Sequence, residues 1–452
     1  MIRSATIFLT LFALLACGPK PPTDDEPSSP EASAAMAEIS EDYVRLVLAV
    51  GRHDDNFVDA YYGPAEWRQE AEAGEPVPLE DLSARADALQ ERLSAVPAGD
   101  ATGDAAAQGD LFGLRLSFFR AQLRAVSSRI AMLNGADFTF DEESRRLYDA
   151  VAPHHPEGHY EALLASLAGE LPGDGPLTER YTAWQEQFVI PPNKVSAVFD
   201  AAIAECRRRT AERLELPESE SFTVEYVTDQ PWSAYNWYQG DYNSLIQVNT
   251  DLPIAIDRAV DLACHEGYPG HHVFNVLIER DLVRDRGFQE LSVYPLFSPQ
   301  SLIAEGTANF GIEVAFPGEE RTAFERDVLY PLAGLDPARA EEYSRVRTLM
   351  ADLAYAGNEA ARQYLNGEID ADQAAAWLER YALSSRPRAE QRVRFYDRYR
   401  SYVINYNLGQ DIVRRWVEAQ GGTADNPEAR WAAFEALLNT PRIASGLAVD
   451  GD

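Results

Sequence analysis

The stretch HEGYPGHH, residues 265–272, holds three of the seven histidines of the chain together with a glutamate. In the HExxH signature of zinc peptidases, two histidines four residues apart share one helix face, and the glutamate beside the first is the general base. Here the second histidine comes six or seven residues after the first. The spacing leaves three alternatives: a damaged zinc site, a rebuilt one, or a buried histidine cluster without a metal.

A regular helix does not bring either later histidine to the face of His265. At 100° and 1.5 Å per residue, His271 lies about 120° round the helix and about 9 Å along it. His272 returns to the same face but lies about 10.5 Å along, which is a long reach for one ion. Two of these histidines therefore share a metal only if the helix is irregular.

The residues between the histidines predict such an irregularity. Pro269 cannot donate to the carbonyl group of His265, and the flanking glycines of GYPG (267–270) permit an unusual backbone. We interpret GYPG as a bulge inserted into a metal helix, since removing two of its residues restores HExxH. This favours the rebuilt site, with His265 and His271 as ligands and Glu266 as base. A structural histidine cluster at a kinked helix is the alternative.

A catalytic zinc ion takes three protein ligands and keeps one position open. The stretch SPQSLIAEGTANFGIEVAF (298–316) begins with a good helix entry and contains Glu305. The small residues after Glu305 allow another helix to come close. Glu313 lies two turns further on and could reach the same side, so the spacing alone leaves the third ligand open between these acids.

The rest of the body is predicted to be mainly helical. Apolar residues recur at spacings of three and four, and the amphipathic helices expected from them include Lys194–Leu216, Pro337–Leu365 and Arg388–Ala419. Residues 97–109 are expected to form a loop. Ser221–Val227 and Ser233–Thr250 alternate instead, and Gly240-Asp241 between two runs indicates a hairpin. We therefore expect a small antiparallel β-sheet beside the helix of His265.

The amino terminus has the pattern of a bacterial lipoprotein. Residues 1–17 have a basic start and an apolar run shorter than the about 20 residues of a membrane span, which is typical of a secretory signal peptide. Leu14–Cys17 resembles a lipobox, so Cys17 is the predicted lipidation site; the alternative is an ordinary signal peptide. Gly18 favours the outer membrane, facing the periplasm. Residues 18–35 are predicted to be a disordered tether.

Residues 36–452 are expected to form a single body, with a helical amino-terminal half (36–190) and a catalytic half (191–445). The formal net charge of −33 excludes nucleic acid as an expected partner. The 46% of hydrophobic residues suffice for a substantial core. The sequence leaves the oligomeric state open, and also whether Cys206 and Cys264 pair.

HEGYPGHH followed by AEGTANF (304–310) resembles the bacterial family catalogued as domain of unknown function 885. Further stretches are similar to recurring stretches of that family, namely VDAYYGP (58–64), VNTD (248–251) and YNLGQ (406–410). The family is in turn similar to the Taq-type zincin carboxypeptidases. The resemblance implies a large helical zincin-like (gluzincin) body over residues 40–420.

Carried over to this chain, the resemblance implies zinc (Zn2+) on His265, His271 and Glu305, with Glu266 activating a zinc-bound water. Tyr406 is implied as the donor to the oxyanion of the reaction.

Two further residues carry expectations that leave alternatives open. Arg400 is expected to bind a carboxylate of the substrate. His272 is expected either to stabilise one of the ligands without binding the metal itself, or to be the metal ligand in place of His271. Thr307 departs from the family, which has tryptophan there, and this departure bears on the shape of the pocket.

The sequence therefore predicts a membrane-anchored zinc metallopeptidase that hydrolyses short peptides, with carboxypeptidase action as one possibility and endopeptidase action as another. One alternative is a zinc-dependent amidase or esterase that acts on a different substrate. The other is a zincin-like lipoprotein that binds a partner without catalysis.

Overall fold

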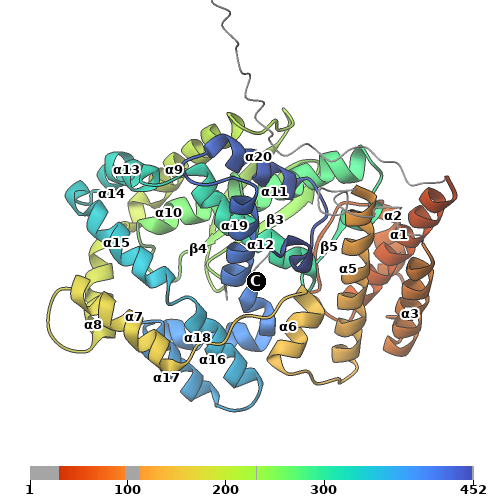
Figure 1. The fold of residues 1–452 in the computed structure, drawn as a ribbon, viewed down its shortest axis with the longest axis horizontal. Helices are drawn as coiled ribbons and strands as arrows, with labels where there is room; N and C mark the ends of the chain where they lie inside the picture. The colour runs from red at the N-terminus through yellow and green to blue at the C-terminus, as the bar shows by residue number, and fades with distance from the viewer. Residues whose placement is uncertain (1–29, 97–110, 231, 450–452) are drawn as a thin grey trace, which may run out of the picture.

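The computed structural model describes residues 30–96, 111–230 and 232–449. The described chain is mainly helical with two small sheets, which confirms the predicted fold class (Figure 1). The larger helices are α1 (Pro30–Gly51), α2 (Ala65–Glu72), α3 (Leu79–Ala95), α5 (Leu111–Leu133), α6 (Phe140–Tyr148), α7 (Glu157–Glu170), α8 (Leu177–Gln185), α9 (Val195–Ala211), α12 (Pro299–Ala315), α15 (Ala340–Ala351), α16 (Tyr355–Leu365), α17 (Ala371–Tyr381), α18 (Arg386–Tyr399), α19 (Ile404–Ala419) and α20 (Pro427–Leu438). The shorter helices are α10 (Asp257–Leu262), α11 (His271–Leu277), α13 (Glu320–Phe324) and α14 (Tyr330–Ala333).

The predicted signal peptide, Cys17 and the loop at residues 97–109 lie outside the described residues. The predicted tether, residues 18–35, extends too far, because α1 begins at Pro30. Its first residues, PEASAA, are mostly good helix formers behind a proline, which is tolerated in the first turn of a helix. Among the described residues no helix is both long and apolar enough to cross a membrane.

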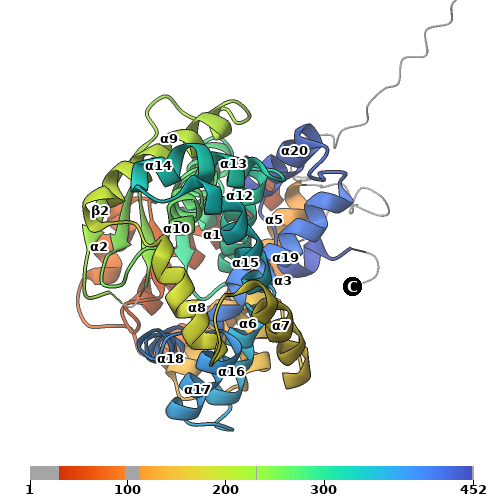
Figure 2. The ribbon, with the colours of Figure 1, turned by 90° about the vertical axis from the view of Figure 1, so that its left-hand side faces the viewer.

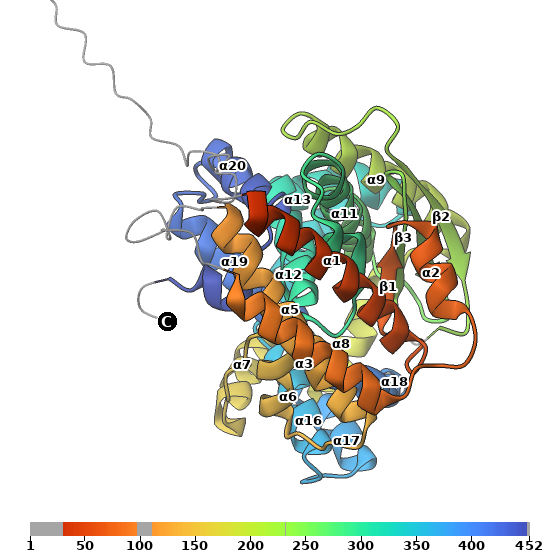
Figure 3. The same cartoon turned by 90° about the vertical axis from the view of Figure 1, so that its right-hand side faces the viewer.

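Helices α12 and α19 pack closely against each other in the middle of the molecule (Figure 1). Helices α1, α3 and α5 lie side by side along one flank, as Figure 3 shows. Helices α16, α17 and α18 gather at one end with α6 and α7. The buried apolar side chains of these layers form one continuous core, so the body is built around the α12–α19 pair.

The larger sheet contains β2 (Ser221–Val227), β3 (Ala234–Gly240) and β4 (Asn243–Asn249) in the order β2-β4-β3. The predicted hairpin is present, since β3 and β4 are antiparallel and joined at Asp241 and Tyr242, which have positive φ angles. The sheet is mixed, however, and the expectation of a purely antiparallel sheet is wrong. Strand β4 lies between β2 and β3. It pairs antiparallel with β3 and parallel with β2.

The smaller sheet pairs β1 (Val58–Tyr61) with β5 (Val293–Pro295) in antiparallel orientation. Val58 lies opposite Pro295 and Ala60 lies opposite Tyr294, so Asp59 is an extra residue in β1. Such a bulge bends the strand and changes the direction of its side chains. Strand β1 also lies next to β3, which brings the two sheets together (Figure 3).

Two helices predicted as continuous are interrupted. Pro337–Leu365 is divided into α15 and α16, and Arg388–Ala419 is divided into α18 and α19 at Arg400, whose φ is +51°. A buried carboxylate from a distant helix stabilises the second break. Glu143 of α6 accepts hydrogen bonds from Arg400 Nε at 2.6 Å and from Ser401 N at 3.0 Å and Ser401 Oγ at 2.6 Å.

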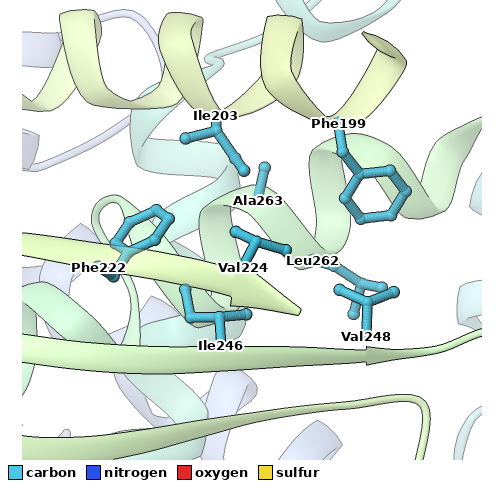
Figure 4. A pocket seen from close by; sticks show the side chains of 8 residues that line it. All are labelled: Phe199, Ile203, Phe222, Val224, Ile246, Val248, Leu262 and Ala263. Carbon is cyan, nitrogen blue, oxygen red and sulfur yellow. The ribbon is translucent and has the colours of Figure 1, made fainter. Parts of the chain in front are cut away.

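Helix α9 lies over α10 and the helical turn that follows it; α9, α10 and β2 face the viewer in Figure 2. A small hollow between α9, the sheet and this turn is lined by apolar side chains (Figure 4). A disulfide between Cys206 of α9 and Cys264 joins the same elements, with a Cα–Cα distance of 5.8 Å. The helix of HEGYPGHH is therefore fixed by apolar packing and by a covalent bond.

Candidate metal centre

The helix that carries HEGYPGHH is interrupted between its histidines. Helix α10 continues into a π-helical turn, Ala263–Gly267, and α11 begins at His271. Between them the Tyr268–Pro269 peptide bond is cis, and Gly270 N donates to the carbonyl oxygen of Cys264 at 2.9 Å. A Cβ atom at Gly270 would lie 1.9 Å from the carbonyl oxygen of His265, so glycine is required there. The irregularity predicted from GYPG is thus a wide turn followed by a break.

This break brings three predicted ligands together. His265 Nε2 lies 3.1 Å from His271 Nε2, and Glu305 Oε2 lies 3.2 Å and 3.7 Å from these two nitrogens. The three form a group whose ligand atoms are all within 4.8 Å of one another. The two imidazoles are 12% and 13% exposed, so the cluster is largely enclosed but remains accessible from one side.

The donor set and its dimensions fit a zinc ion. For bonds of 2.0–2.1 Å, two corners of a tetrahedron are separated by about 3.3 Å, which is close to the three distances above. Glu305 Oε2 is buried and has no hydrogen-bond partner among the described residues. A buried carboxylate oxygen without a partner is costly, and a cation between the three side chains would satisfy it. Two histidines and one glutamate form a ligand set of catalytic zinc sites.

Two residues outside the predicted site orient these ligands. Asn309 Oδ1 lies 3.0 Å from His265 Nδ1, which leaves Nε2 of that ring free to bind a metal. Tyr402 OH donates to Glu305 Oε1 at 2.8 Å, which leaves Oε2 facing the two imidazoles. Neither residue was among those predicted from the sequence. Asn309 is four residues after Glu305 on the same helix face, and this spacing was the only signal for it.

The charges of the cluster compensate one another in the structure. Burial lowers the pKa of His271, but the neighbouring carboxylate of Glu305, with the charges of Glu266 and Asp59, raises it to about 9. Burial raises the pKa of Glu305, but His265 and His271 bring it well below its usual range. A metal ion bound here therefore competes with a proton on the imidazole of His271.

Glu266 and Tyr406 lie beside this cluster. Glu266 is 5% exposed, and its charge acts on the pKa of both His271 and Tyr406. Burial, followed by the charge of Glu305, raises the pKa of Tyr406 well above its usual value, so its hydroxyl group stays protonated. The backbone carbonyl of Tyr406 accepts from Asn309 Nδ2 at 2.9 Å, which links α19 to the ligands.

His272 points away from the three ligands. Its Nδ1 lies 2.9 Å from Ser244 Oγ of β4, and its Nε2 lies 2.9 Å from Glu220 Oε2. Both ring nitrogens are therefore engaged in a buried network, to which Tyr268 OH also contributes a hydrogen bond at 2.6 Å to Glu220. The hydrogen bonds of His272 thus go to β4 and Glu220 and not to the three proposed ligands, and they tie the start of α11 to the sheet.

Two other residues singled out in the sequence lie elsewhere. The Arg400 guanidinium donates from Nε to Glu143, as described above. The expected role of Arg400 in binding a carboxylate of the substrate stays a prediction. Thr307 is fully buried, and its hydroxyl donates to the carbonyl of Ile303 within α12 at 2.8 Å.

The approach of α19 to Glu305 depends on two glycines. A Cβ atom at Gly306 would lie 2.4 Å from the carbonyl oxygen of Gly409, and one at Gly409 would lie 2.6 Å from the carbonyl oxygen of Leu302. The small residues after Glu305 do let another helix come close, as predicted from the sequence. This contact places the tyrosines that precede and begin α19 against the metal cluster.

No protein-family model matches the chain, and no curated protein matches it in sequence. The assignment to domain of unknown function 885 therefore stays a prediction. A candidate lipoprotein from Colwellia psychrerythraea has a similar fold, with a TM-score of 0.50 at 14% identity over 86% of this chain and 79% of that one. This likeness concerns the fold alone.

Two weaker likenesses accompany it. A candidate lipoprotein of unknown function from Shewanella oneidensis has a TM-score of 0.41 at 14% identity, over 80% of this chain and 72% of that one. An M32 carboxypeptidase from Deinococcus radiodurans R1 has a TM-score of 0.44 at 13% identity, over 92% of each chain. At these scores neither carries an argument about activity.

Proposed function

We propose that the protein is a zinc-dependent peptidase that acts on short peptides. The observation that carries the proposal is the convergence of His265, His271 and Glu305, with a glutamate next to the first histidine in the chain. Zinc held by these residues would polarise the scissile carbonyl group and lower the pKa of water. The rest of the chemistry falls to the side chains around it.

Glu266 is the general base in this proposal. It is buried beside the cluster, and it would take a proton from the attacking water and pass the proton to the leaving nitrogen. Tyr406 would donate a hydrogen bond to the oxyanion, because its raised pKa keeps the hydroxyl protonated. Asn309 and Tyr402 would hold His265 and Glu305 in the orientation that the metal requires.

The experiment is hydrolysis of a mixed library of short peptides by the full chain in mild detergent, loaded with zinc. We expect cleavage by the wild type and a loss of at least about 100-fold in rate for Glu266→Gln, with zinc content unchanged. Glu313→Gln is the matched control, because Glu313 lies on the same helix as Glu305 and bonds Gln410 and Arg414. Cleavage of amide or ester compounds without cleavage of any peptide would favour an amidase or esterase. Binding without turnover of any substrate would favour a non-catalytic protein.

We also propose that the chain is anchored through a lipid on Cys17 to the outer membrane and faces the periplasm. The proposal is supported by the lipobox-like Leu14–Cys17 and by the fold shared with a candidate lipoprotein. Metabolic labelling with palmitate in a bacterial host tests it, with Cys17→Ser as comparison. Label in the wild type alone is the expected result, and equal label in both would contradict it.

A further inference from the structure

A carboxylate outside the ligand set lies at the edge of the metal centre. Asp59 is the extra residue of the bulge in β1, the strand paired with β5. Its Oδ1 accepts a short hydrogen bond from the hydroxyl group of Tyr235 at the start of β3. Within the described ranges no arginine or lysine forms an ion pair with it.

Aromatic rings surround the partner of this carboxylate. Tyr235 and Trp237 are two residues apart in β3, so their rings lie on the same face of the strand, and the ring centroids are 4.4 Å apart. Trp232 lies 5.7 Å from Tyr235 on the other side. Trp237 is 39% exposed, which is rare for a large apolar side chain in the described part of the protein. Strand β3 therefore presents an aromatic face that ends at Asp59.

The electrostatic surroundings of Asp59 favour a cation. Burial raises the pKa of Asp59 to about 6; the hydrogen bond from Tyr235 and the charge of His271 oppose this, and the charges of Glu305 and Glu266 add to it. Asp59 is therefore an additional carboxylate beside Glu266 and Glu305, and within the described ranges no arginine or lysine pairs with it. A carboxylate at the end of a strand face that carries tyrosine and tryptophan rings is suited to an ammonium group, which would gain an ion pair with the carboxylate and cation–π contacts with the rings.

We propose that Asp59, Tyr235 and Trp237 form a subsite for the free α-ammonium group of a short peptide. This inference rests on the proposed peptidase function and adds that the enzyme recognises the amino terminus of its substrate. A peptide carboxylate placed against Asp59 would be repelled by the charge of Asp59. Arg400, the arginine expected to attract such a carboxylate, is bound to Glu143.

The test measures binding separately from turnover. Zinc-loaded Glu266→Gln protein, as the full chain in mild detergent, is titrated with trialanine in three forms: free, amino-terminally acetylated and carboxyl-terminally amidated. Tryptophan fluorescence and calorimetry report binding, because Trp237 lines the subsite. We expect acetylation to weaken binding by roughly tenfold or more and amidation to change it by less than about twofold, since a factor of ten corresponds to one charged contact.

Asp59→Asn in the same background is expected to bind the free and acetylated peptides with similar affinity. Asp411→Asn is the matched control, because Asp411 is also partly buried and accepts a tyrosine hydroxyl, from Tyr355 at 2.7 Å. The control should keep the preference for the free amino group. Zinc content and thermal melting of each variant confirm that it is folded.

Equal binding of free and acetylated peptide, or weaker binding after amidation alone, would overturn the subsite. If the wild type then still cleaves peptides, the proposed function stands without it. If the free peptide binds in preference but the wild type cleaves none, the subsite stands and the proposed function fails.

Discussion

Reduction of the Cys206–Cys264 disulfide is expected to destabilise the protein by about 4 kcal/mol. The bond joins α9 to the turn that carries His265, across a sequence separation of 58 residues. Closing a loop of that length removes about 14 cal/mol/K of entropy from the unfolded chain, which is about 4 kcal/mol at 25 °C. Both cysteines are fully buried, so reduction leaves the surrounding packing in place and acts through the unfolded state.

The assay is urea unfolding followed by circular dichroism, with and without reductant. EDTA is present throughout, so that metal binding does not contribute. With an m value of about 2–3 kcal/mol/M, the midpoint of the wild type should fall by roughly 1–2 M on reduction. The double variant Cys206→Ala, Cys264→Ala should not respond to reductant. A loss of less than about 1 kcal/mol in the reduced wild type would show that the disulfide does not stabilise the fold through the unfolded chain.

Three further predictions concern residues that support the centre. Tyr402→Phe removes the hydrogen bond to Glu305, so the Kd for zinc, measured against a chelating dye, should rise about tenfold; an unchanged Kd would argue against this role. Gly306→Ala forces a Cβ atom against Gly409 and should lower the free energy of unfolding by about 1–3 kcal/mol, and an unchanged melting temperature would contradict the close helix contact. Burial raises the pKa of Glu220, but hydrogen bonds from His272, Tyr268 and Arg207 bring it down from 4.5 to about 2. The stabilisation by Glu220 is therefore complete above pH 4.5 and lost as the pH falls through 2. Glu220→Gln should be less stable by about 1.5–3 kcal/mol at pH 7, with the difference shrinking between pH 4.5 and 2; a difference in urea unfolding that does not change with pH would contradict it.

Local signals in the sequence were enough to predict the elements that bring the ligands together. Proline and glycine within HEGYPGHH predicted the break that moves His271 toward His265, because backbone restrictions of these residues act locally. The alternation around Gly240-Asp241 predicted the β3–β4 hairpin for the same reason. The third ligand was open between two acids, and only the three-dimensional arrangement places Glu305, and not Glu313, at the histidines.

The features that escaped prediction depend on contacts between distant segments. The break at Arg400 depends on Glu143, which is 257 residues away in the chain and accepts a hydrogen bond from Arg400 Nε. Asp59 reaches the centre through a strand pairing with β5, and Tyr402 reaches it through the close approach of α19 to α12. The parallel pairing of β2 with β4 is likewise decided by which strand returns to the middle of the sheet. Periodicity in a single segment contains no information on such pairings.

The most direct test of the account is the zinc content of the full chain, measured by elemental analysis after zinc loading and dialysis. The wild type and Glu313→Gln should hold about one zinc ion per chain, and Glu305→Gln should hold much less, because a zinc site that loses one of three ligands binds weakly. A wild type without zinc, or a Glu305→Gln variant that retains it fully, would contradict the assignment of His265, His271 and Glu305 as a metal centre.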